Sequence, residues 1–211
     1  MKKAVKYIVG TALILFIGYN AVYFRKLSEV RKQDAKKFDA AAFAKNLWEK
    51  EFPLKLDQAM MLPVLIQAVN ENKDAGLQKY SNALAIGNYR YALIKTSALV
   101  TGVNEDELMV QLPAGNGDSV LTALLATEFI YGNAIRDASG LIDVREFPNT
   151  TELNNISEEL NRIIRTTVIP PIRSGVSKGD RLLITAAVEL NKEHIKWNGM
   201  ELMPLRVQIE K

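Results

Sequence analysis

An uninterrupted apolar run opens the chain. Residues 7–24 carry no charge and consist mostly of Ile, Leu, Val, Ala, Phe and Tyr, between Lys6 and the pair Arg25-Lys26. A helix rises about 1.5 Å per residue, so this run would cover roughly 27 Å, close to the thickness of a bilayer core. Its residues are apolar on all sides rather than along one stripe, which disfavours a helix packed on a soluble core. The pattern predicts a single transmembrane helix.

The C-terminal end of the run argues against removal of the segment. A cleaved secretory signal needs small residues at its cleavage positions, whereas residues 18–24 read Gly-Tyr-Asn-Ala-Val-Tyr-Phe. A lipoprotein signal needs a cysteine to acylate, and the chain contains no cysteine. We expect an uncleaved signal-anchor, with a cleaved signal as the alternative. The anchor and its juxtamembrane segment are assigned to residues 1–32.

Charge on the two flanks does not fix the orientation of this anchor. Cytoplasmic flanks are normally richer in Lys and Arg. Here the three lysines before the run nearly balance the four basic residues that follow it within residues 25–32. The flanking charges therefore leave open which side of the membrane the rest of the chain faces.

Helical signals follow over residues 33–80, which we interpret as a helical arm. Asp39 is a good N-cap residue, and Pro53 ends the first helix of the arm. Three apolar residues recur with helical spacing in that helix: Phe43, Leu47 and Trp48.

Strand signals dominate residues 81–211, where β-branched and aromatic residues alternate with polar ones. A capping box over residues 149–152, with Asn149 as the cap, starts a helix that runs to about residue 167. The order strand, strand, strand, helix, strand, strand is that of an OB-type five-stranded barrel. The sequence thus predicts an α+β chain with an OB-like β-barrel domain over residues 81–211. The predicted strands are residues 89–101, 107–112, 120–130, 181–190 and 201–209.

Prolines give two further expectations. Pro170 and Pro171 are expected to end the helix that begins after Asn149, because proline lacks the N–H that a helix interior requires. Pro204, inside the last predicted strand, cannot donate to a ladder and is expected at a sheet edge or a bulge.

Composition removes several classes of function. Residues 1–32 hold seven Lys/Arg and one acid, so residues 33–211 hold 27 − 7 = 20 basic and 24 − 1 = 23 acidic residues, a net charge of −3. Such a domain lacks the cationic excess that phosphate-dominated binding needs, and no nucleic-acid partner is predicted. Without cysteine and with His194 as the single histidine, the sequence predicts no cofactor, no metal site and no catalytic residue.

Two segments stand out as candidates for a binding or structural motif. The first enters the first predicted strand. The second follows the third strand and ends at Gly140, and its glycines allow backbone angles that other residues avoid. In the second segment an arginine beside an aspartate offers a charge pair, with a structural corner as the first interpretation and a binding site as the second. The candidate residues are Gly87, Asn88, Tyr89, Gly132, Asn133, Arg136 and Asp137.

At these residues the chain resembles a bacterial family of unknown function, described as predicted periplasmic lipoproteins and often encoded beside ribose-type sugar ABC transporters. The resemblance covers roughly residue 38 to the C-terminus, and it implies an exported protein with an OB-like core. It also favours a domain facing the periplasm from a single-pass anchor in the cytoplasmic membrane, although this chain has no lipobox cysteine. The motifs that carry it are residues 38–40, 48–49, 87–89, 132–137, 160–161 and 204–207, with Phe147.

Two classes of function stay open. The first, which we favour, is a membrane-anchored binding or accessory module that is not an enzyme and that serves a sugar ABC transporter component. The alternative is an envelope enzyme acting on a carbohydrate or lipid, which would need carboxylates paired across a cleft. No spacing in the sequence brings together the acids available for that role: Glu128, Asp137 and Asp143.

Overall fold

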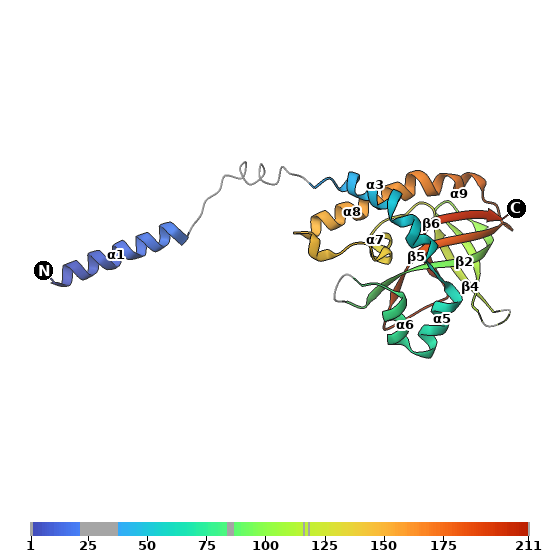
Figure 1. Ribbon diagram of the computed structural model, residues 1–211, viewed down its shortest axis with the longest axis horizontal. Coiled ribbons are helices and arrows are strands. Elements are labelled where there is room, and N and C mark those ends of the chain that lie inside the picture. The colour runs from blue at the N-terminus through green and yellow to red at the C-terminus, as the bar shows by residue number, and fades with distance from the viewer. Residues whose placement is uncertain (1, 22–37, 84–86, 116, 118, 211) are drawn as a thin grey trace. The chain divides into compact units, whose positions relative to one another are not determined.

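The computed structural model describes residues 2–21, 38–83, 87–115, 117 and 119–210. The chain divides into two compact units, Met1–Phe38 and Asp39–Lys211, which are treated separately below. Figure 1 shows helix α1 in the first unit and the remaining labelled helices and strands in the second.

Helix α1 (Lys2–Ala21) carries exposed apolar side chains, including Ile8, Leu13 and Phe16. No helix among the described residues is long and apolar enough to cross a membrane. The transmembrane helix predicted over residues 7–24 is therefore not confirmed. Residues 22–37, with the predicted juxtamembrane segment, lie outside the described part of the chain.

The second unit begins with short helices. Asp39 caps the first of them as predicted, since its Oδ1 accepts a hydrogen bond of 2.9 Å from the N–H of Ala42. Proline is tolerated in the first turn of a helix, and Pro53 lies there in the second helix rather than simply ending the first. The helices are α3 (Ala40–Lys50), α4 (Phe52–Asp57), α5 (Leu62–Glu71) and α6 (Lys73–Tyr80).

A closed five-stranded barrel forms the centre of this unit. Its strands pair in the order β2-β3-β4-β6-β5, and β5 pairs back with β2, which closes the ring. The predicted α+β class and OB-like barrel are confirmed. The sequence analysis missed β1 (Met60–Met61), a two-residue strand that pairs parallel with β2. The barrel strands are β2 (Tyr89–Val103), β3 (Glu107–Pro113), β4 (Val120–Ala126), β5 (Arg181–Asn191) and β6 (Met200–Glu210).

Helices fill the connection between β4 and β5. Asn149 caps α8 as predicted, because its Oδ1 accepts a hydrogen bond of 3.0 Å from the N–H of Glu152. The expectation that Pro170 and Pro171 end this helix is wrong. A π-helical turn follows α8, and both prolines fall at the start of α9, where a missing N–H costs little. The elements are α7 (Ala134–Ser139), η1 (Val144–Glu146), α8 (Thr150–Ile163), η2 (Ile164–Val168) and α9 (Ile169–Gly175).

The bulge expected at Pro204 is present. The register of β5 and β6 shifts between Thr185 and Ala186, and Ala186 lies opposite Pro204. An extra residue at this point lets the ladder pass a residue without an N–H.

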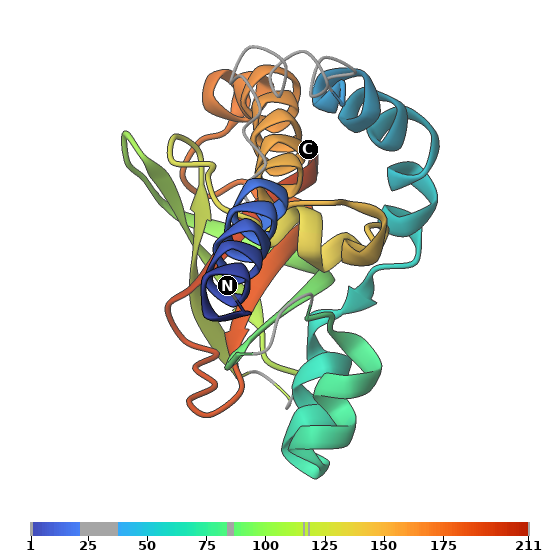
Figure 2. The same ribbon diagram turned by 90° about the vertical axis from the view of Figure 1, so that its left-hand side faces the viewer.

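Side-chain bonds attach the arm to the barrel. Lys95 Nζ on β2 donates to the Asp57 carbonyl at 2.6 Å, and Arg206 Nη1 on β6 donates to Asp57 Oδ1 at 2.7 Å. The hydrogen bond from Arg206 holds the pKa of Asp57 below its ordinary value. Elsewhere in the unit α3 lies beside α8 (Figure 2). The rings of Phe43 and Phe147 pack edge to face there, with their centroids 5.7 Å apart.

Candidate functional site

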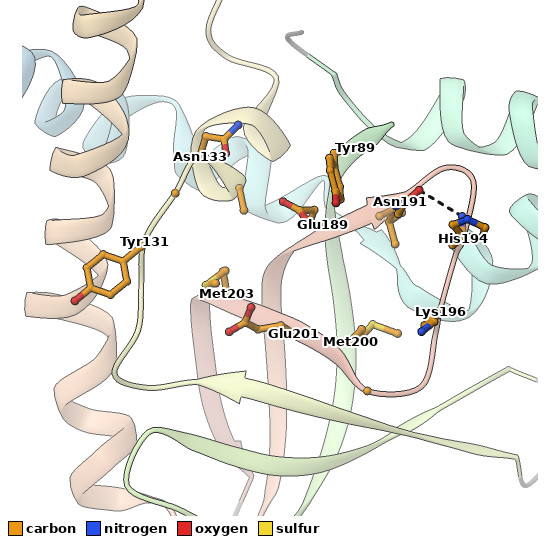
Figure 3. A pocket seen from close by; sticks show the side chains of 14 residues that line it. Tyr89, Tyr131, Asn133, Glu189, Asn191, His194, Lys196, Met200, Glu201 and Met203 are labelled. Carbon is orange, nitrogen blue, oxygen red and sulfur yellow. Dashed lines mark hydrogen bonds between the residues drawn. The ribbon is translucent and has the colours of Figure 1, made fainter. Parts of the chain in front are cut away.

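A pocket of about 530 Å³ opens where β2 begins, β5 ends and β6 begins. Residues of the β4–α7 connection line one side of it and residues of the β5–β6 hairpin line another. Figure 3 shows Glu189 and Glu201 between Tyr131 on one side and His194 with Lys196 on the other. The remaining labelled side chains are Tyr89, Asn133, Asn191, Met200 and Met203.

This pocket brings together parts of both segments that the sequence singled out. Tyr89 comes from the first segment, and Gly132 and Asn133 come from the second. Gly87 is exposed and Asn88 is half-buried, and neither lines the pocket. The backbone carbonyl of Asn88 instead accepts a hydrogen bond of 2.7 Å from the N–H of Lys192, which connects the start of β2 to the hairpin.

Two carboxylates that the sequence analysis did not consider lie in the pocket. Glu189 is the third residue from the end of β5, and Glu201 is the second residue of β6. Partial burial raises the pKa of Glu201, and the negative charges of Glu107 and Glu189 raise it further. The pocket therefore brings two carboxylates together. Lys196 is the lysine among its lining residues.

A buried tyrosine lies behind this acidic surface. Tyr91, only 8% exposed, lies opposite Glu189 in the pairing of β2 with β5. Burial, together with the charge of Glu189, raises the pKa of Tyr91 to about 12. The hydroxyl thus stays protonated at neutral pH.

Arg136 and Asp137, the charged candidates of the second segment, are buried in α7 rather than displayed in the pocket. Their side chains are 8% and 3% exposed, and Arg136 Nε donates to Asp137 Oδ1 at 2.5 Å. Asn133 Nδ2 donates to Asp137 Oδ2 at 2.5 Å, and Arg136 Nη1 donates to the Leu153 carbonyl at 3.1 Å. This geometry corresponds to the structural interpretation of the segment, in which the pair joins α7 to α8.

A second cavity, of about 450 Å³, adjoins the buried pair between α7 and α8. Gly132 and Asn133 line it as well as the first pocket, so the Gly132–Asn133 turn separates the two. Its remaining lining residues are Arg136, Asn154, Ser157, Glu158 and Asn161.

The three acidic residues considered as catalytic carboxylates of an enzyme do not lie together. Asp137 pairs with Arg136, whereas Glu128 pairs with Arg173 and Asp143 with Arg145. Within the described residues no group of three or more His, Asp or Glu side chains could hold a metal ion.

Family comparison covers nearly the whole chain. Residues 12–208 match the family described as "Predicted periplasmic lipoprotein (DUF2291)", and the chain belongs to this family. The resemblance inferred from the sequence motifs is thereby confirmed. Membership also supports the prediction of a periplasmic, membrane-associated protein.

Comparison with solved structures supports the fold. The crystal structure of an OB-fold protein from Thermotoga maritima superposes with a TM-score of 0.69 at 23% sequence identity. The match covers 82% of this chain and 99% of the other chain. At this identity the likeness shows the OB fold alone. A search of curated proteins gave no match.

Proposed function

We propose that the protein is a periplasmic binding module and that its ligand is a saccharide bound in the pocket between Tyr89, Tyr131, Glu189 and Glu201. The observation that carries this proposal is the combination of exposed aromatic rings with carboxylate hydrogen-bond acceptors in one pocket. Tyr89 and Tyr131 are 51% and 57% exposed. Flat rings stack on the apolar faces of sugar rings, while carboxylates and amides bind hydroxyl groups.

The position of the pocket in the fold supports the same class of ligand. OB-fold proteins commonly bind oligosaccharides or oligonucleotides near the loop between their last two strands. That loop is the β5–β6 hairpin here, and it contributes His194 and Lys196 to the pocket. The carboxylates Glu189 and Glu201 would repel phosphates, which favours a saccharide over a nucleic acid.

Titration of the full-length protein by calorimetry tests this proposal, with D-ribose, D-glucose and N-acetyl-D-glucosamine as probes. We expect at least one of them to bind, and Tyr89→Ala to weaken that binding at least tenfold because a stacking surface is lost. Tyr80→Ala is the matched control, since Tyr80 lies on α6 and does not line the pocket. Equal affinities of the two variants would contradict the assignment of the site.

A separate assay distinguishes binding from catalysis. An enzyme acting on carbohydrate would release new reducing ends from maltotriose or from the β-1,4-linked trimer of N-acetyl-D-glucosamine. We expect none from Glu128, Asp137 and Asp143, because each is held by a separate arginine. Any turnover would have to use Glu189 and Glu201, the carboxylates that line the pocket. Turnover by the wild type that is lost in Glu201→Gln would show that the protein is an envelope enzyme and not a binding module.

We further propose that the N-terminal run, residues 7–24, holds the protein at the cytoplasmic membrane, where it serves a sugar ABC transporter. The exposed apolar side chains of α1 and the description of the family support the attachment to a membrane. The full chain should stay with membranes through salt and carbonate washes. A Leu13→Asp, Leu15→Asp variant should be released, because it places charge on that apolar surface. A wild-type protein that washes off with salt would refute the tether.

A further inference from the structure

The cavity between α7 and α8 has the features of a second ligand site. Three polar side chains that line it are more than nine-tenths buried: Arg136 is 7% exposed, Ser157 is 6% exposed and Asn161 is 1% exposed. Asn161 Nδ2 donates to the Gly132 carbonyl at 2.9 Å, but its Oδ1 is buried and has no hydrogen-bond partner in the described structure. An unpaired buried acceptor costs free energy. A hydrogen-bond donor from outside the chain would remove that cost.

The cavity also offers unused donors and acceptors. A guanidinium carries five N–H donors, and the bonds of Arg136 to Asp137 and to the Leu153 carbonyl use two of them. Ser157 Oγ donates to the Leu153 carbonyl at 3.2 Å, which leaves its lone pairs available. A ligand here can accept hydrogen bonds from Arg136 and donate one to Ser157 Oγ or to Asn161 Oδ1.

Charge restricts the ligand further. The charge of Arg136 is balanced by Asp137 at 2.5 Å, and that of Glu158 at the rim is balanced by Arg165 at 2.5 Å. These pairs give the cavity no net attraction for an anion or a cation. Hydroxyl groups satisfy both conditions, because each donates and accepts while remaining neutral.

The Gly132–Asn133 turn forms the boundary between this cavity and the first pocket. Gly132 lies in the left-handed region at φ +75°, and a Cβ at that position would have no heavy atom within 4 Å. Open space above a residue without a side chain leaves room for a ligand to pass from one cavity to the other.

We propose that the ligand is an oligosaccharide that crosses the Gly132–Asn133 turn, with one sugar unit in the tyrosine-lined pocket and the next in the α7–α8 cavity. This inference rests on the saccharide-binding function proposed above. The inference adds a second sugar position, so a monosaccharide would occupy only one of the two positions.

Calorimetry on the full-length protein with two matched series tests this inference: D-glucose with maltose and maltotriose, and N-acetyl-D-glucosamine with its β-1,4-linked dimer and trimer. In one series we expect the dimer to bind at least tenfold tighter than the monomer. Asn154→Trp, at an exposed rim position of the cavity, should abolish that gain and leave monomer affinity unchanged. Asn155→Trp, exposed on the same helix but outside the cavity lining, is the control and should retain the gain.

The possible failures are distinguishable. Monomer and dimer binding with equal affinity, or a gain that survives Asn154→Trp, would overturn the second sugar position and leave the saccharide-binding function standing. No binding by D-ribose or by any member of either series would overturn both.

Discussion

Replacing Asp137 with alanine is expected to lower the free energy of unfolding by about 3–5 kcal/mol, as breaking a buried ion pair normally does. The substitution leaves the Arg136 guanidinium buried without its counterion and frees the Asn133 amide that also bonds Asp137. The first change leaves a charged group buried away from water, and the second removes a hydrogen bond from a half-buried amide. Urea denaturation followed by circular dichroism measures the loss, and urea is preferred because guanidinium chloride would screen the ion pair.

Asp143→Ala provides the matched comparison. Arg145 Nη2 lies 2.5 Å from Asp143 Oδ2, as close as the buried pair, but the side chains are 87% and 37% exposed. The hydrogen bond from Arg145 lowers the pKa of Asp143 to about 2, yet water and salt screen an exposed pair. We expect a loss clearly smaller than that of Asp137→Ala but still measurable, because Asp143 Oδ1 also accepts a hydrogen bond of 2.9 Å from the backbone N–H of Arg145 as the N-cap of η1. Similar losses in the two variants would show that burial does not decide the strength of these pairs.

The barrel was predictable from the sequence because its strands alternate between a buried and an exposed face. Along β2, Ile94, Ala98 and Val100 point into the core, while Ser97 and Leu99 between them are exposed. Turn-forming residues separate such runs, so the order of strands and helix could be matched to an OB barrel. The predicted third strand ran to residue 130, whereas β4 ends at Ala126, because its apolar residues continue into the connection that packs against α8.

The site was less accessible to sequence reasoning. Tyr89, Gly132 and Asn133 were identified from local patterns, but Glu189 and Glu201 were not. The two glutamates are twelve residues apart, at the end of one strand and the start of the next. Only the pairing of β5 with β6 brings them to one pocket. The buried Arg136–Asp137 pair was visible as a charge pair, but its burial follows from the packing of α7 against β2 and α8, which no local pattern encodes.

Gly140→Ala is expected to cost about 1–3 kcal/mol of stability, as forced left-handed backbone commonly does. Gly140 ends α7 at φ +61°, where an L side chain is strained. A Cβ there would also lie 2.9 Å from Asn82 Nδ2. That amide donates to the Ala138 carbonyl at 3.0 Å, so it cannot move aside without losing the bond.

Gly132→Ala separates strain from crowding, since Gly132 has a similar φ of +75° but open space at the position of a Cβ. We expect both variants to unfold at lower urea concentration than the wild type, with the larger shift at Gly140. If Gly132→Ala shifted the midpoint as much, the contact with Asn82 would contribute nothing. The whole loss would then come from the backbone angle that the glycines of this segment supply.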